Sequence, residues 1–379
     1  MIYLDNNATT RVLPEVLETM LPFYTELWGN PSSIHHFGGQ VAPHLDKARE
    51  QIAALIAAQR SNEIIFTGCG TEANDLAIRG ALQANPSKKH LVTTPVEHSS
   101  VLMLCEQLKS TGYQITALPV DARGNLDLKN LEAAITNDTA LVSIMWANNE
   151  TGVLFPIEAI SKICAEKNVP LHTDATQAAG KIPIDLRKTP VDLLSMSGHK
   201  MHSPKGIGAL YVKRGTKLAP QMVGGSQERG RRAGTENVAG IAGFGKAAEL
   251  AKQRLEQNVF LEVEKKRNQL EQKIKSKFPW VKINGAEAKR LPNTSSLSFE
   301  GIEGETICIL LSEDKIAAST GSACSAGSLE PSHVLKAMGL QPKQARGTIR
   351  ISLSADTTAA EINSATECIE KIIQRLKKN

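Results

Sequence analysis

Two side chains of different chemical character follow apolar stretches in the middle of the chain. Lys200 comes just after the apolar run 193–196, and Asp174 ends the run 169–173. A lysine amine held in a cleft loses solvation, which lowers its pKa and makes it a nucleophile for an aldehyde. A carboxylate in the same cleft can keep a pyridine nitrogen protonated, so that the ring withdraws electrons. Each has an ordinary alternative, because most lysines are solvent-exposed and aspartate is favoured at helix N-caps.

A third feature is the small-residue stretch 68–71, Gly-Cys-Gly-Thr, between an apolar run and a helix-compatible segment. Small residues let backbone N–H groups approach an anion, and the N-terminus of the following helix favours a phosphate. The stretch is not a Walker A sequence, because the Lys-Ser/Thr pair is missing. The alternative is a capping box without a ligand, in which Thr71 is the N-cap and Asn74 lies three residues later.

The fourth feature is Cys324, which lies in the run of small residues 317–328. Such a run lacks side chains large enough to anchor it in a core and predicts a mobile loop, in which a thiol is chemically available. A surface cysteine without a function is the alternative. Cys69 adjoins the predicted phosphate turn, but we assign it no role. The five cysteines other than Cys324 lie in or beside apolar runs, and we expect them to be inert packing residues. They are Cys69, Cys105, Cys164, Cys308 and Cys368.

The elements that must position these residues alternate between strand-like and helix-like stretches from about residue 60 to residue 215. This alternation predicts an α/β fold, in which helices cover both faces of a mostly parallel sheet. Ligands of such folds bind at the carboxyl ends of the strands, where several of the polar residues fall. Residues 235–278 are almost entirely helix-compatible, and residues 260–379 mix short strands with helices, which indicates a second domain.

Composition excludes several classes of protein. The chain has 379 residues, 22% of them charged, and a net charge of +5, which is ordinary for a soluble enzyme. Aromatic residues are only 4%, which disfavours stacking on single-stranded nucleic acid. No apolar run reaches the roughly 18 residues of a membrane span, and residues 1–7 lack the pattern of a signal peptide. The six cysteines lie far apart without a CxxC pair, which argues against a disulfide scaffold or a zinc site and predicts a cytoplasmic protein.

The order of the chemical features is more specific than any one of them. A phosphate-binding turn, then His98, then Asp174 with Gln177, and finally Lys200 follow successive predicted strands. The phosphate, the pyridine nitrogen and the aldehyde of one cofactor would each find a partner in this set. The combination therefore predicts a site for pyridoxal phosphate.

With these motifs the chain resembles the cysteine desulfurases of the NifS/IscS type, which are class V pyridoxal-phosphate-dependent aminotransferases. The resemblance runs nearly from end to end. Its matching segments are residues 3–10, 29–33, 70–74, 97–98, 148–152, 174–177, 197–200, 232–237, 321–324 and 328–332. The segment around Cys324 is the specific marker, because it separates desulfurases from ordinary aminotransferases of this fold.

The resemblance implies a fold-type I enzyme, whose large domain has a mostly parallel seven-stranded sheet and is joined by a smaller α+β domain. It places the large, cofactor-binding domain at residues 13–258. Residues 1–12 and 259–379 would form the small domain, which carries the loop with the catalytic cysteine. It also implies a homodimer with a shared active site.

The resemblance further implies a role for each matching residue. Lys200 would form the Schiff base with pyridoxal phosphate and then act as a base, Cys324 would be the nucleophile, and His98 would stack on the ring and carry protons. Asp174 would pair with the pyridine nitrogen and Gln177 with the phenolic oxygen. The cofactor-binding residues are Gly70, Thr71, His98, Asn149, Asp174, Gln177, Ser197, His199, Lys200 and, from a second subunit, Thr235. Arg350 and Asn149 would bind the carboxylate of the substrate.

The implied activity converts L-cysteine to L-alanine and leaves the sulfur on Cys324 as a persulfide. An iron–sulfur scaffold protein or another acceptor would take the sulfur, so that Cys324 supplies a metal cluster while the enzyme holds no resident metal. No membrane is expected as a partner, nor nucleic acid beyond a tRNA-thiolation relay. The alternatives are a selenocysteine lyase, another pyridoxal-phosphate lyase or aminotransferase, and a non-catalytic binding protein. The joint presence of Lys200, Asp174, His98 and Cys324 argues against the last of these.

Overall fold

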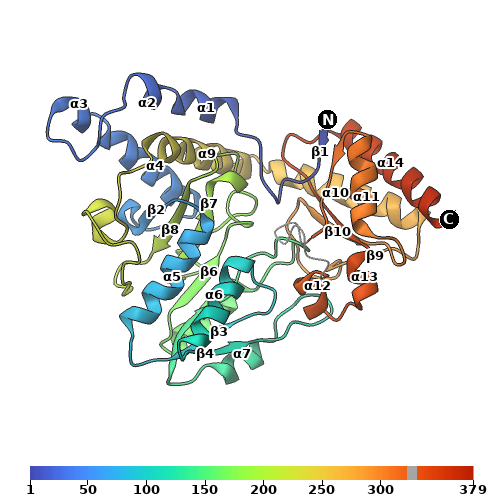
Figure 1. Ribbon diagram of the computed structural model, residues 1–379, viewed down its shortest axis with the longest axis horizontal. Helices are drawn as coiled ribbons and strands as arrows, with labels where there is room; N and C mark the ends of the chain where they lie inside the picture. The colour runs from blue at the N-terminus through green and yellow to red at the C-terminus, as the bar shows by residue number, and fades with distance from the viewer. Residues whose placement is uncertain (322–330, 379) are drawn as a thin grey trace.

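The computed structural model describes residues 1–321 and 331–378 of the chain. Figure 1 shows two bodies beside each other. One is built around a large sheet and carries the N-terminal helices. The other contains most of the C-terminal third of the chain together with the first strand, so the two ends of the chain lie in the same body.

The larger body is organised by a seven-stranded sheet in the order β2-β8-β7-β6-β5-β3-β4. The pairs β7–β6, β6–β5, β5–β3 and β3–β4 are parallel, whereas β8 runs antiparallel to both of its neighbours. The predicted α/β fold with a mostly parallel seven-stranded sheet is therefore confirmed. The strands are β2 (Ile64–Thr67), β3 (His90–Thr93), β4 (Gln114–Ala117), β5 (Thr139–Ser143), β6 (Leu171–Asp174), β7 (Leu193–Ser197) and β8 (Gly208–Val212).

Helices cover both faces of this sheet, as the alternation in the sequence predicts. Side chains alternate along a strand, so Ile65 packs with one group of helices while Ile64 and Phe66 pack with the other. One face meets α5 (Gly70–Ala84) and α6 (Ser99–Ser110). The other face meets α4 (Ala42–Leu55), α7 (Leu128–Ala134), α8 (Ile157–Glu166) and α9 (Val238–Glu256). The N-terminal helices α1 (Pro14–Met20), α2 (Pro22–Thr25) and α3 (His36–Gly39) lie beyond α9 (Figure 1).

The smaller body has a three-stranded antiparallel sheet in the order β12-β10-β9 and a short parallel pair, β1 with β11. Their bounds are β1 (Ile2–Tyr3), β9 (Lys282–Ile283), β10 (Thr294–Ser298), β11 (Ile316–Ala317) and β12 (Thr348–Ser352). The helices are α10 (Val259–Lys277), α11 (Gly304–Glu313), α12 (His333–Ala337), α13 (Pro342–Arg346) and α14 (Ala359–Lys378). The helix-compatible segment after residue 235 forms two helices rather than one, because Asn258 between α9 and α10 adopts a left-handed conformation.

Two apolar clusters bear on the division into domains. Leu4 packs in the apolar cluster of the smaller body, as the prediction that residues 1–12 belong to the small domain expects. Leu291 and several residues of 334–345 pack instead with the cluster that lies on the large sheet. The boundary between residues 258 and 259 stays a prediction, with the contact between the bodies made partly by residues after it. Within the described part of the chain, no helix has the length and apolarity that crossing a bilayer requires.

A buried ion pair joins three parts of the larger body. The guanidinium of Arg49 on α4 donates to both carboxylate oxygens of Glu228, at 2.7 and 2.9 Å, and also to the carbonyl of Ile64. The same carboxylate accepts from the backbone N–H of Phe66 on β2. Glu228 holds a left-handed backbone conformation (φ 46°), which these hydrogen bonds secure.

Replacing Arg49 by methionine should therefore lower the free energy of unfolding by about 3–5 kcal/mol, because it leaves the Glu228 carboxylate buried without a cation. Denaturant unfolding followed by circular dichroism measures the change. Lys252→Met, which breaks an exposed pair with Glu256, is the matched control and should have a much smaller effect. Equal losses in the two variants would contradict this account.

Candidate active site

A cavity of about 390 Å³ lies where the carboxyl ends of the central strands face the N-terminal segment and β12. Nearly all of the predicted site residues line it, although they come from separate elements. They are Gly70, Thr71, His98, Asn149, Asp174, Gln177, Ser197, His199, Lys200 and Arg350. A cavity of this size suits a small cofactor together with an amino acid.

Among the described residues, one predicted site residue does not line this cavity. Thr235 is exposed and lines a different hollow, which also includes Glu228 and Arg232. Thr235 therefore does not line the cavity of its own chain. Cys324 lies outside the described residues, so its prediction is not tested here.

Lys200 ends a 3₁₀ turn, Gly198–Lys200, that directly follows β7. Its Nζ donates hydrogen bonds to the backbone carbonyls of Asn7 and Ala8, each at 2.7 Å. The short turn places the side chain at the end of the strand, and the two carbonyls hold its amine beside the cavity. The alternative of an exposed surface lysine is therefore wrong.

The N-terminal segment supplies a residue that the sequence analysis missed. Asn7 is buried, and its carbonyl accepts from Gln177 Nε2 at 3.0 Å as well as from Lys200. Its side chain donates to Thr294 Oγ1 and to the carbonyl of Asn149. Asn7 thus joins both bodies at the cavity. A signal for it was present, because the matching segment 3–10 had no chemical role assigned.

Asp174 ends β6 and is buried at the floor of the cavity. One carboxylate oxygen accepts from the backbone N–H of Thr176 at 2.9 Å, as an Asx turn does, and the other accepts from Asn74 Nδ2 at 2.8 Å. Asn74 is a further residue that the sequence analysis did not predict as a site residue. These two donors fix the plane of the carboxylate and leave its remaining lone pairs for a ligand in the cavity.

The N-terminus of α5 forms a wall of the cavity. Cys69 rather than Thr71 is the N-cap, since its sulfur accepts from the N–H of Glu72, so the alternative of a capping box that begins at Thr71 is wrong. Gly70 leaves room at the start of the helix, because a Cβ there would lie 3.0 Å from the Ser197 Cβ and would require that side chain to shift. The N–H groups of a first helical turn have no intrahelical acceptor and can bind an anion.

His199 lies beside this helix terminus. Its Nδ1 is 3.1 Å from Thr9 Oγ1, and its carbonyl accepts from both the N–H and the hydroxyl of Thr10. Burial and the nearby cations, Lys200 first among them, lower the pKa of the imidazole to about 4. His199 is therefore neutral near pH 7 and can donate one hydrogen bond to an anion without adding a positive charge to the site.

His98 is the N-cap of α6 and follows a buried glutamate. Its Nδ1 accepts from the backbone N–H of Ser100 and lies 2.9 Å from Ser100 Oγ, which orients the ring at the cavity. Glu97 is fully buried, and burial raises the pKa of its carboxyl group to about 8. One Glu97 oxygen accepts from Thr94 and from the N–H of Met145, while its other oxygen has no partner in the described residues. A neutral carboxylic acid thus supports the backbone next to His98.

Arg350 reaches the cavity from β12 in the smaller body. Its Nη2 is paired with Asp5 at 2.7 Å, and its Nη1 donates to the carbonyl of Asn149 at 3.1 Å. The Nε atom is buried and has no partner among the described residues. Asp5, which the sequence analysis did not single out, holds the guanidinium in place while leaving part of its donor set for an anionic ligand.

Both described flanks of residues 322–330 approach one carboxylate. Ser332 Oγ donates to Glu150 Oε2 at 2.5 Å. Gly321 is so close to the same carboxylate that a Cβ would lie 2.5 Å from Glu150 Oε2. Glu150 follows Asn149, which lines the cavity, so the two flanks lie near the mouth of the site.

The residues present fit pyridoxal phosphate. An amine stands ready for the aldehyde at Lys200, and the buried carboxylate of Asp174 suits a protonated pyridine nitrogen. Gly70 leaves space at the start of α5 that any Cβ would fill, with Ser197 and His199 close by for a phosphate. Among residues 1–321 and 331–378 no cluster of three His, Cys, Asp or Glu side chains could hold a metal ion.

The predicted division of the cysteines is correct at some positions. Cys105 and Cys164 are buried, and burial raises the pKa of each thiol to about 12, so both are inert packing residues. Cys308 packs against the core of the smaller body, and burial likewise raises its pKa to about 12. Cys69 is exposed and lines the cavity, so the expectation that it is a packing residue is wrong.

Comparisons with known proteins agree with this site. Residues 2–364 match the family model described as aminotransferase class-V. The chain is 53% identical over 377 residues to a protein named cysteine desulfurase from Trichormus azollae, which covers 100% of this chain and 94% of that relative. It is 51% identical over 376 residues to one named cysteine desulfurase NifS from Azotobacter vinelandii, covering 99% of this chain and 93% of the relative. A solved structure described as a NifS-like protein superposes with a TM-score of 0.92 at 40% identity, covering 99% of this chain and 100% of that one.

The raised pKa of the buried Glu97 carboxyl group predicts how the free energy of unfolding depends on pH. Its pKa is raised from 4.5 to about 8, so the folded protein holds a proton that the unfolded chain releases between these values. The stabilisation is complete below the lower value and is lost as pH rises through the higher one, by up to about 1.4 kcal/mol per pH unit.

Glu97→Gln removes this titration while keeping the shape of the side chain. The free energy of unfolding of both proteins is measured by denaturation from pH 5 to 8. The value for the variant should rise relative to that of the unmodified protein as pH increases. Glu106→Gln, an exposed site on α6, controls for the loss of one negative charge. A difference between Glu97→Gln and the unmodified protein that stays constant with pH would show that Glu97 is ionised in the folded state.

Proposed function

This chain belongs to the class-V aminotransferase family and is a pyridoxal-phosphate-dependent cysteine desulfurase, and on that premise we propose that the cavity around Lys200 is its active site. One observation carries the proposal. One cavity is lined by a lysine amine, a buried carboxylate and a helix N-terminus. These groups come from three separate elements, namely the turn after β7, the end of β6 and the start of α5.

We propose the following partners for the cofactor. Lys200 binds its aldehyde, Asp174 its pyridine nitrogen, and His98 the face of its ring, while the amide of Gln177 faces the phenolic oxygen. The first turn of α5, through Gly70 and Thr71, holds the phosphate with Ser197 and His199. Bound in this way, pyridoxal phosphate supplies an aldehyde for amines and a ring that accepts the electrons of the substrate α-carbon.

The residues of the chain then divide the work on L-cysteine. Arg350 binds the substrate carboxylate through the donors that Asp5 leaves, and Asn149 completes that contact. Lys200 would act as the base that removes the α-proton of the bound substrate and later returns a proton to the α-carbon. The carbonyls of Asn7 and Ala8 support this step, because they hold the amine near the cavity in the orientation found here. His98 moves a proton at the substrate thiol.

Cys324 is proposed as the residue that takes the sulfur. Its thiolate forms a bond to the substrate sulfur while the bond between that sulfur and the substrate β-carbon breaks, and the β-carbon gains a proton. The products are L-alanine and a persulfide on Cys324. The position of Gly321 supports the assignment, because a residue three places further along can lie within about 10 Å of it, close to the mouth of the cavity.

A second copy of the chain is proposed to complete the phosphate site. Thr235 is exposed and does not line the cavity of its own chain, whereas it follows the loop that Glu228 and Arg49 secure. A threonine held on a rigid loop at the surface suits a contact with the cofactor phosphate of a neighbouring subunit. The downstream acceptor is proposed to be an iron–sulfur scaffold or another sulfur-accepting protein in the cytoplasm.

Cys324→Ala should abolish persulfide formation and reduce sulfide release from cysteine at least a hundredfold, while the bound cofactor keeps its colour. Mass spectrometry of the peptide that contains residue 324, after incubation with L-cysteine, measures the added sulfur. Cys368→Ala, at a partly exposed cysteine on α14, is the control and should retain both activities. Sulfide release from Cys324→Ala at the native rate would exclude Cys324 as the nucleophile.

Thr235→Ala should weaken retention of pyridoxal phosphate about tenfold, the loss expected for one hydrogen bond to a charged group. Equilibrium dialysis of the apoprotein against the cofactor gives the dissociation constants. Thr111→Ala, at the far end of α6, provides the control. An unchanged dissociation constant, or a monomeric holoprotein in sedimentation, would contradict a shared site.

A further inference from the structure

Lys181 is a buried lysine close to the active site that none of the steps above uses. Its side chain is only 6% exposed. The Nζ atom donates to Gln177 Oε1 at 2.6 Å and to Asn7 Oδ1 at 3.3 Å. No carboxylate lies within ion-pair distance of it among the described residues. Burying a lysine amine whose partners are only neutral amide oxygens is costly, which calls for a function.

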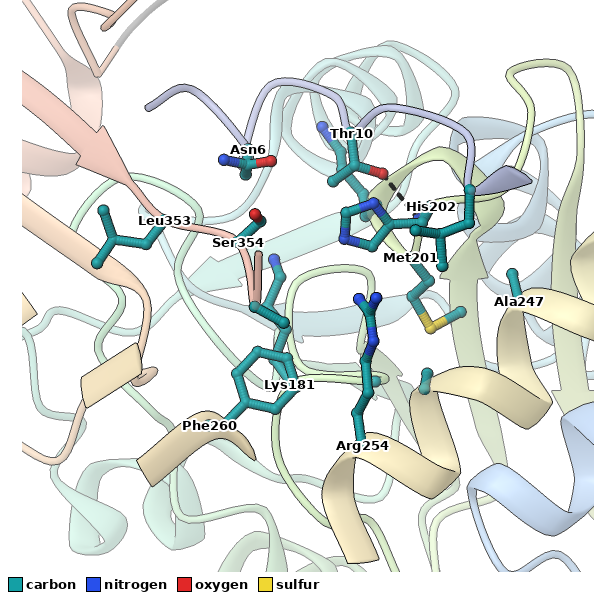
Figure 2. Close-up of a pocket in the computed structure, with 15 residues that line it drawn as sticks. Asn6, Thr10, Lys181, Met201, His202, Ala247, Arg254, Phe260, Leu353 and Ser354 are labelled. Atoms are coloured by element: carbon teal, nitrogen blue, oxygen red, sulfur yellow. Dashed lines mark hydrogen bonds between the residues drawn. The ribbon is translucent and has the colours of Figure 1, made fainter. Parts of the chain in front are cut away.

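A small cavity adjoins this amine. Lys181 and Lys200 both line a small cavity of about 30 Å³, separate from the active site. Figure 2 shows Lys181, Phe260 and Leu353 on one side of it, with Met201 and Arg254 opposite. The space is large enough for about one water molecule. Burial first, and then the charges of Lys200 and Arg350, lower the pKa of Lys181 well below its ordinary value.

The hydrogen bonds of Gln177 determine which way its amide points. The Asn7 carbonyl can only accept, so the Gln177 atom 3.0 Å from it is the nitrogen, and the Gln177 carbonyl oxygen faces the Lys181 amine at 2.6 Å. An amide nitrogen has two hydrogens, and Gln177 lines the active-site cavity, so its second N–H remains for a ligand there.

The same lysine also steadies Asn7. The oxygen of the Asn7 side chain accepts from Lys181 and from Asn293 Nδ2, and the Asn7 carbonyl holds both Gln177 and Lys200. Replacing Lys181 would leave the Gln177 amide held by the Asn7 carbonyl alone and would loosen one contact of Asn7. The effect on the site would therefore arise mainly through the amide of Gln177.

We propose that Lys181 is a positioning residue, which locks the amide of Gln177 with its N–H donor toward the phenolic oxygen of the cofactor. This rests on the proposed function, in which Gln177 faces that oxygen. A donor there stabilises the phenolate, so the link between Lys200 and the cofactor loses its proton at lower pH than it otherwise would. The protonation of that link controls the visible absorption of the holoenzyme, which makes the proposal measurable without an activity assay.

The test is a spectroscopic pH titration of the holoenzyme in Lys181→Met, Gln177→Ala and the double variant. Each single change should raise the midpoint of the visible transition by about one pH unit, which corresponds to one hydrogen bond to a charged group. The double variant should shift no further than Gln177→Ala, because Lys181 acts through that amide. The value of kcat for cysteine should fall in Lys181→Met with little change in KM.

Matched variants separate this role from a structural one. Lys188→Met removes an exposed lysine and should leave the midpoint unchanged. Lys181→Arg keeps the donors and should restore at least half of the shift. Methionine in place of a buried lysine is expected to fold, because the exchange removes a buried charge. Lys181→Gln, which can donate only through an amide that is free to turn, provides a second variant with an intermediate shift.

Three outcomes would overturn the proposal. The first is a coloured Lys181→Met and Lys181→Gln with the native midpoint. The second is additive shifts in the double variant, which would give Lys181 an effect independent of Gln177. The third is a shift in Lys181→Arg as large as that in Lys181→Met. An unmodified protein that binds pyridoxal phosphate without colour would instead contradict the proposed function, so the two failures can be told apart.

Discussion

The amine of Lys200 is held by the carbonyl oxygens of Asn7 and Ala8, and the arrangement of the active site depends on this contact. Lys200 lies almost 200 positions after Asn7 and Ala8 in the chain. Asn7 is tied in turn to the smaller body, since its backbone N–H donates to Ser352 Oγ and its side chain to Thr294. The position of the reactive amine relative to Arg350 therefore depends on a few buried hydrogen bonds of one N-terminal segment.

Basic side chains outnumber the carboxylates that pair with them around the site. Lys181, Lys200 and Arg350 bring three basic side chains close together, and among the described residues the carboxylate of Asp5 pairs with one of them, Arg350. A dianionic phosphate at the start of α5 and the carboxylate of an amino acid at Arg350 would compensate the excess. The site is thus prepared for anionic ligands, and the neutral His199 adds a hydrogen-bond donor without adding another charge.

Much of the fold could be predicted from local pattern. The alternation of apolar strands and helices gave the parallel sheet, and because strand ends converge in such a sheet, it also gave the position of Asp174 and Lys200. The partners of those residues could not be predicted in this way. Asn7, Asn74 and Asp5 are common residue types whose roles arise from contacts across 100 or more positions, such as Asn74 with Asp174. Cys69 was predicted to be a packing residue because it lies beside an apolar run, whereas its role as a helix cap depends on where α5 begins.

The most direct test of the central claim is reduction of the holoenzyme with borohydride, followed by peptide mapping. The account predicts that the visible colour is lost and that the mass of the reduced cofactor appears on the peptide containing Lys200. Lys181 serves as an internal comparison, because it is also buried and lies near the cavity. Cofactor found on the Lys181 peptide, or no covalent cofactor at all, would contradict the assignment of Lys200 as the reactive amine.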